Sequence, residues 1–196
     1  MGSPQTLSQA DRRVVAGWAA DCAERLLGLF EAELPGHDRP REAIARARAF
    51  ARGELEVAGE IRRRFLGGAA AREVSAPAAV AAVRAAGQAA AVAHMGAHAL
   101  GAAAYAAKAA GLAAPDRPDA VSEEIRWQVD HMSAPVRAAL LKLPPIGENR
   151  SGPLGPGLCH TGVLGTIIRE LQASLAGGRQ SSASGEPDGA RQTSNR

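Results

Sequence analysis

Apolar residues recur every three or four positions through most of the first 143 residues, a spacing that places them on one face of an α-helix. The first such segment carries Val15, Trp18, Cys22, Leu26 and Leu29. Ser8 stands where its side chain can cap the start of this helix, and Pro35 and Gly36 follow its predicted end near Glu33. The pattern therefore predicts a first helix of about 25 residues.

A second helical pattern begins after Asp38, which we expect to cap it, with Pro40 in the first turn, where a missing N–H has no cost. Gly53 interrupts the pattern, which then continues to the Gly67–Gly68 pair. One long helix and two shorter helices divided near Gly53 both fit these residues.

The segment from Pro77 to Ala114 consists almost wholly of alanine, glycine and valine, and it predicts helix with a break near Gly96. A further amphipathic pattern follows residue 119, and a short helix is expected to end at Leu143. No segment alternates apolar and polar residues with the period of two that a strand shows. The sequence therefore predicts an all-α fold, a single compact bundle of about five to seven helices over residues 6–143.

Composition changes after Pro144, where glycine, proline and serine dominate. We expect residues 144–196 to form a largely disordered C-terminal tail, because such a segment has little apolar surface to bury. Leu164, Ile167, Ile168, Leu171 and Leu175 are the exception, since their spacing predicts one isolated helix over residues 162–175.

Hydrophobic residues make up 46% of the 196 positions, but much of this is alanine and only 3% of the chain is aromatic. The net charge of +3 is close to balance, and the run Arg62–Arg64 lacks the stacking aromatics of a nucleic-acid binder. Cys22 and Cys159 are too few for a disulfide scaffold or a zinc site. We find no secretion signal and no membrane span, so we expect a cytoplasmic protein with no nucleic-acid or membrane partner.

One predicted helical stripe carries the candidate chemistry: Ala91, His94, His98, Gly101, Tyr105 and Lys108. Histidines four residues apart can share a metal ion, but the sequence shows no third ligand for His94 and His98 unless Asp21, Cys22 or Glu24 packs beside them. We favour buried histidines that hydrogen-bond to neighbouring helices, and therefore predict no metal and no cofactor. A third interpretation places the stripe at a surface groove that contacts a partner.

Three other candidates have simpler structural interpretations. Cys22 lies on the apolar stripe of the first helix, without a neighbouring base that would activate it, so we expect a small core residue. Asp21 and Glu24 are expected on an exposed face with arginine partners, Arg25 being four residues after Asp21. Trp18 is expected to anchor the core.

Four strings occur in a fixed order: Trp18-Ala-Ala-Asp-Cys-Ala-Glu24, Arg39-Pro-Arg-Glu-Ala-Ile44, Arg84-Ala-Ala-Gly-Gln88, and His98-Ala-Leu-Gly-Ala-Ala-Ala-Tyr-Ala-Ala-Lys108, the last preceded by Ala93-His94. Together they resemble an immunity-protein family of high-GC bacteria, of the polymorphic-toxin antidote type, some members of which are labelled exonuclease. The resemblance spans Leu7 to Leu143. It implies a helical domain that neutralises a toxin protein, with candidate binding positions at Asp21, Glu24, His94, His98, Tyr105 and Lys108.

Three functions are compatible with these observations. We predict a non-catalytic cytoplasmic protein that binds and neutralises a cognate toxin, because occlusion needs a rigid surface and no catalytic residues. A metal-assisted hydrolase using His94 and His98 is the first alternative. A helical scaffold that forms homo-oligomers through its alanine-rich faces is the second.

Overall fold

The structure, a computed structural model, describes residues 3–56, 70–156 and 161–177. Within these ranges it contains seven α-helices and no strand, which confirms the all-α prediction. The helices are α1 (Gln9–Glu33), α2 (Arg39–Ala51), α5 (Pro77–Ala91), α6 (His98–Ala113), α7 (Ala120–Asp130), α8 (Ala134–Leu140) and α9 (Gly162–Gly177). None of the helices in the described ranges combines the length and apolar character needed to cross a bilayer.

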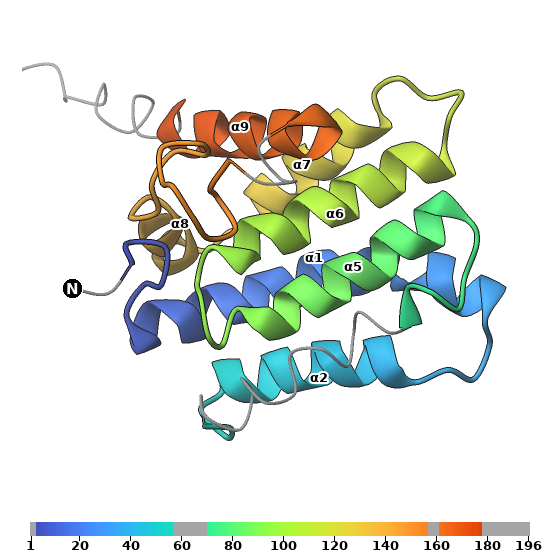
Figure 1. The fold of residues 1–196 in the computed structure, drawn as a ribbon, viewed down its shortest axis with the longest axis horizontal. Helices are drawn as coiled ribbons and strands as arrows, with labels where there is room; N and C mark the ends of the chain where they lie inside the picture. The colour runs from blue at the N-terminus through green and yellow to red at the C-terminus, as the bar shows by residue number, and fades with distance from the viewer. Residues whose placement is uncertain (1–2, 57–69, 157–160, 178–196) are drawn as a thin grey trace, which may run out of the picture.

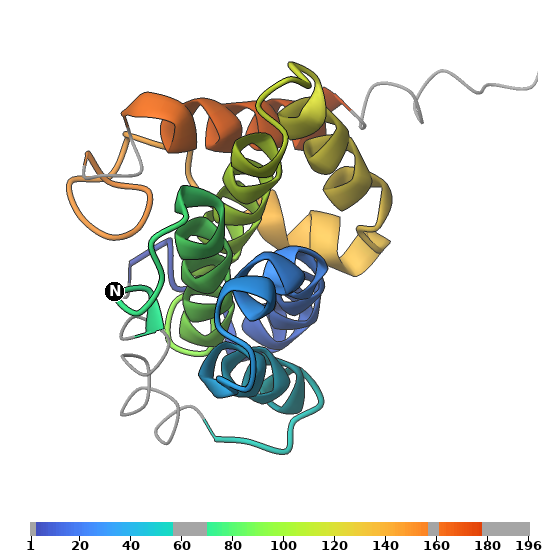
Figure 2. The same ribbon diagram turned by 90° about the vertical axis from the view of Figure 1, so that its right-hand side faces the viewer.

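Helix α1 is central to the bundle, because it packs against α2, α5, α6 and α8. Figure 1 shows α5 and α6 side by side in front of α1, with α2 below and α9 above. The turn at residues 92–97 reverses the chain between α5 and α6. The end-on view in Figure 2 shows α1 between α2 and the α7–α8 side of the molecule, with α9 crossing the top.

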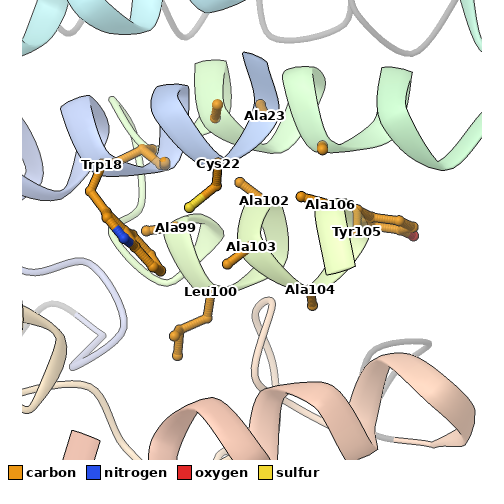
Figure 3. Close-up of a cluster of buried hydrophobic side chains, with 14 of the residues drawn as sticks. Trp18, Cys22, Ala23, Ala99, Leu100, Ala102, Ala103, Ala104, Tyr105 and Ala106 are labelled. Carbon is orange, nitrogen blue, oxygen red and sulfur yellow. The ribbon is translucent and has the colours of Figure 1, made fainter. Parts of the chain in front are cut away.

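Alanine allows α6 to pass through the middle of this arrangement. Every residue from Ala99 to Ala107 is buried, so this helix has no solvent-exposed side over about two turns. Small side chains let neighbouring helices approach closely, because helix separation depends on the residues at the contact. In Figure 3, Cys22 of α1 points toward Ala102 and Ala103, while Leu100 points the other way, toward α9.

Trp18 and Cys22 take the core positions that the periodicity predicts. The Trp18 side chain is 3% exposed, and its indole N–H donates to the Gln128 backbone oxygen at 2.9 Å. That bond gives the only polar atom of a buried tryptophan ring a partner. Cys22 is fully buried, and burial raises the pKa of its thiol, with Glu124 and Asp21 adding to the effect. A buried thiol that resists ionisation is a core residue and not an activated nucleophile.

The first two helix boundaries depend on local residues, with one exception. The Ser8 hydroxyl accepts the N–H of Asp11 and caps α1, as predicted. Asp38 precedes α2, but its side chain makes no cap hydrogen bond, so that predicted cap is wrong. Helix α2 ends at Ala51 and Gly53 follows with a φ of +81°, a left-handed conformation that glycine adopts without strain. The predicted continuation to Gly67–Gly68 lies outside the described residues.

The predicted C-terminal helix exists, but it is not isolated. Helix α9 packs against α6 and α7, and it buries the apolar face that the sequence pattern defines: Leu164, Ile167, Ile168, Leu171 and Leu175. The loop that precedes it is attached to the N-terminal segment, because Gln5 accepts the N–H of Leu154 and donates to the Ser151 oxygen. Residues 178–196, also expected to be disordered, lie outside the described part of the chain.

Candidate partner-binding surfaces

The stripe predicted on one continuous helix is divided between two elements. Helix α6 carries His98, Gly101, Tyr105 and Lys108, whereas His94 lies in the turn that connects α5 to α6. The predicted break near Gly96 is confirmed, and its position removes His94 from the helix. The N-terminal segment holds this turn in place, because Thr6 accepts the N–H of Gly96 and Gln5 accepts that of Ala97.

The turn nevertheless brings the two histidine rings together, with centroids 5.0 Å apart. The His94 Nδ1 atom lies 2.9 Å from the Ala91 carbonyl oxygen, and the His98 Nδ1 atom lies 2.7 Å from Gln88 Oε1. Both acceptors require that Nδ1 carries the proton. Burial, and to a smaller extent His94, lowers the pKa of His98 from 6.5 to about 4. His98 is therefore neutral at pH 7, partly buried and hydrogen-bonded to the neighbouring helix α5.

The histidine pair gains no third ligand from helix α1. This helix does pack beside α6, but Asp21 and Glu24 bind the guanidinium of Arg48. Among the described residues, no group of three His, Cys, Asp or Glu side chains is placed to hold a metal ion.

Tyr105 and Lys108 line a pocket of about 330 Å³ between the first turns of α5 and the second half of α6. The other lining residues are Ser75, Pro77, Val80, Ala81, Arg84 and Leu112. The Tyr105 side chain is 8% exposed, and Figure 3 shows its hydroxyl pointing away from the labelled core residues. The Arg84 guanidinium lies 5.8 Å from the centre of the Tyr105 ring. A polar rim and an apolar wall thus meet in one depression, which we call the α5–α6 pocket.

The cations of the α5–α6 pocket have no carboxylate partner in the part of the chain that the structure describes. Within the described ranges, neither Arg84 nor Lys108 forms an ion pair. Arginines elsewhere do find carboxylates, as when Arg41 binds Glu31 at 2.6 Å. As far as the described residues go, the α5–α6 pocket therefore presents positive charge without a paired anion.

Asp21 and Glu24 lie on a different surface, a groove of about 430 Å³ between α1, α2 and α7. Arg48 of α2 donates to Asp21 at 2.7 Å and to Glu24 at 2.5 Å. The hydrogen bond from Arg48 lowers the pKa of Glu24, so this carboxylate stays ionised and paired. Such a cluster joins two helices and has no free general base.

The predicted pairing of Asp21 with Arg25 on the same helix is wrong. Arg25 reaches across to Glu124 of α7 at 2.7 Å, where the carboxylate is 4% exposed. Its guanidinium also lies 4.4 Å from the centre of the Trp127 ring, which stacks on His131 at 4.0 Å. A buried carboxylate and an aromatic face together hold Arg25 more favourably than an exposed partner four residues away.

The six predicted binding residues therefore do not form one site. Asp21 and Glu24 belong to the groove at α1, while Tyr105 and Lys108 belong to the α5–α6 pocket. His94 lies in the turn between α5 and α6, and His98 is the first residue of α6. Arg84 and Gln88 were not among the predicted binding residues, although both stand in one of the strings that carry the resemblance. Their four-residue spacing places them on one face of α5, which faces α6.

A family model described as Imm-5 like putative immunity protein matches residues 5–135. The chain belongs to this family. The resemblance inferred from the four strings is thereby confirmed, and the match includes both surfaces described above. Helix α9 of this immunity-family chain lies beyond the matched residues. Neither the curated proteins nor the solved structures contain a match to the chain.

Proposed function

We propose that this immunity-family protein binds a cognate toxin protein in the cytoplasm and blocks it without catalysing a reaction. The observation that carries the proposal is the α5–α6 pocket, which combines two cations that no described carboxylate pairs, a tyrosine hydroxyl and an exposed leucine on a protein of the immunity family. Arginine and tyrosine are the residue types that dominate binding energy at protein interfaces.

The packing beneath this surface supports inhibition by occlusion. Tyr105 projects from the buried segment Ala99–Ala107, and Arg84 projects from α5, which packs along α6. Because the core fixes the Tyr105 ring and the backbone that carries Arg84, binding has to order only the exposed Arg84 side chain, and less of the interaction energy is lost to conformational entropy.

Co-expression with the toxic domain encoded beside the immunity gene tests the proposal. We expect restored growth in cells that make both proteins, and a 1:1 complex in size-exclusion chromatography of the purified pair. Failure of the protein to protect against any toxin encoded nearby would contradict it.

Two measurements on the same preparation separate this function from the two alternatives. A hydrolase built on His94 and His98 requires a bound transition metal, which elemental analysis would detect and which the double His→Ala variant would lose. A self-associating scaffold requires a particle mass that rises with concentration. We expect protection without metal and a mass that stays that of one chain.

A further inference from the structure

We infer that the α5–α6 pocket receives an aspartate or glutamate side chain of the partner protein, held by Arg84, Lys108 and the Tyr105 hydroxyl. This inference rests on the proposed function, since it names the chemistry by which a toxin would be recognised. It assigns to this pocket the role of anchor site.

The first argument is the sign of the charge. The described residues that line the α5–α6 pocket include two cations and no carboxylate. Two other pockets on the described surface carry both signs, one with Arg25 and Glu124, the other with Arg48 and Glu24. Those groups neutralise each other, so a charged ligand gains little there. The α5–α6 pocket still has its positive charge available for an anion.

The nearest carboxylate bonded to a lining residue does not compensate these cations. Glu33 accepts the backbone N–H and the hydroxyl of Ser75, and it also accepts the N–H of Ala76. These hydrogen bonds lower the pKa of Glu33 and direct its oxygens to the start of α5. Glu33 therefore binds the backbone that leads into α5, and Arg84 and Lys108 form no ion pair with it or with another described carboxylate.

The second argument is the set of available donors. The Tyr105 hydroxyl makes no hydrogen bond to the described residues, although Tyr105 as a whole is only 8% exposed. A guanidinium can bind both oxygens of a carboxylate, an ammonium contributes a point charge, and a phenol donates one further hydrogen bond. Arg84, Lys108 and Tyr105 together match the acceptor capacity of one carboxylate.

The third argument is the apolar wall, which favours a side chain over a free inorganic anion. Leu112 is 41% exposed, and Val80 and Ala81 line the pocket beside it. The methylene groups of an aspartate or glutamate, and the residues that flank it on a protein surface, can cover this wall. A bare phosphate would bind the same cations but would leave Leu112 in contact with water.

Affinity measurements with the toxic domain test the inference. We expect the Arg84→Gln/Lys108→Gln variant to bind about tenfold or more weakly than the parent, and Tyr105→Phe to bind about threefold or more weakly. The parent complex should also weaken with added NaCl more steeply than the variant complex. Arg126→Gln is the matched control, because Arg126 is exposed on α7 and has no ion pair among the described residues. Equal melting temperatures would show that each variant is folded.

A second arm uses small probes and does not depend on the toxin. N-acetyl-aspartate N-methylamide should shift the NMR signals of Arg84 Nε–H and Lys108, whereas the asparagine analogue should not. Inorganic phosphate should act more weakly than the aspartate probe. Unchanged toxin affinity in the double variant, or a stronger response to phosphate than to aspartate, would overturn the inference while the proposed function stands. A parent protein that binds no toxin would instead overturn the proposed function.

Discussion

His98 illustrates how a single side chain can be placed by burial and one hydrogen bond. Its Nδ1–H donates to Gln88, and its ring lies against His94 in a largely buried position. The sequence indicated that the histidines could be buried or exposed, and spacing alone could not decide between these. The position of His98 depends on its hydrogen bond to Gln88 of α5, which is close to α6 only because of the turn at residues 92–97.

Acid should destabilise the protein through His98. The pKa of this residue is about 4 in the folded protein and 6.5 in its ordinary state, so the unfolded chain binds a proton that the folded chain excludes. The free energy of unfolding therefore falls as the pH decreases from 6.5 toward 4, by about 2 kcal/mol at pH 5. Urea unfolding of the parent and of His98→Gln at pH 7 and pH 5 measures the effect.

Comparison with a second histidine variant makes this test specific. His131 is exposed, so His131→Gln should keep the acid sensitivity of the parent, whereas His98→Gln should lose most of it. The hydrogen-bonded carboxylates Glu24 and Asp11 have lowered pKa values, and their contribution is lost at lower pH in all three proteins. An equal pH dependence in the parent and in His98→Gln would contradict the assignment of a buried neutral ring.

The spacing along a helix predicted which residues lie in the core, but it did not predict which charged residues form ion pairs. Trp18 and Cys22 are in the core because the helical period fixes which face they share. Asp21 and Arg25 have the spacing of a pair, yet each binds a partner from another helix, Arg48 and Glu124 respectively. The choice depends on interhelical positions, which the spacing along one helix does not contain.

At the scale of the helix, two glycines in similar positions should respond oppositely to alanine. Gly28 lies in α1 with open space where a Cβ would be, whereas a Cβ at Gly111 in α6 would lie 2.5 Å from Val121 Cγ2. The Val121 side chain is branched at Cβ and cannot easily move aside.

Gly28→Ala should therefore stabilise the protein by about 0.5–1 kcal/mol, through the higher helix propensity of alanine. Gly111→Ala should destabilise it by about 1–3 kcal/mol, because the close approach of α6 to the segment that begins α7 is lost. Thermal unfolding of the two variants beside the parent checks both. A stabilised Gly111→Ala protein would show that this approach is not tight.

Helix boundaries were predictable where a local residue sets them. Ser8 begins α1, Gly53 follows α2, and the break near Gly96 divides α5 from α6. The contact that holds the chain just before α5 was not predictable, since the carboxylate that accepts the N–H groups of Ser75 and Ala76 belongs to Glu33, 42 residues away from Ser75. Such a contact forms only after the helices have packed.

At the scale of the molecule, α9 should unfold together with the rest of the bundle. Leu171 is fully buried where α9 meets α6 and α7. Leu171→Ala should lower the free energy of unfolding by about 2–5 kcal/mol, the range for a large-to-small change in a core. Val163 on the same helix is 57% exposed, so Val163→Ala should change it by less than about 0.5 kcal/mol.

Urea unfolding, followed by circular dichroism and by tryptophan fluorescence, shows whether α9 unfolds together with the bundle or separately from it. The Trp18 indole bonds to Gln128, and the Trp127 ring contacts Arg25 and His131, so their fluorescence reports on the packing of α1 and α7. We expect one transition at the same urea concentration by both probes. An earlier transition seen only by circular dichroism would show that α9 unfolds separately.

The sequence contained the helix at 162–175 but not its place of contact. Its apolar face was visible in the spacing from Leu164 to Leu175, whereas the surface that accepts it belongs to α6, an alanine-rich helix, and to α7. Alanine-rich faces look alike, so the pattern does not say which of them is covered. The same reason explains why the two candidate surfaces could not be separated before the helices were placed.

The burial of Ala99–Ala107 on every side divides α6 into two kinds of position. Within that run a larger side chain has nowhere to go, so substitutions there are restricted by volume. Tyr105 reaches the pocket from within the run, Lys108 and Leu112 line it from the residues that follow, and Arg84 lines it from α5. After a gene duplication, one copy could therefore acquire a new target through substitutions of the pocket-lining residues alone. The buried alanine-rich segment beneath these residues would stay unchanged.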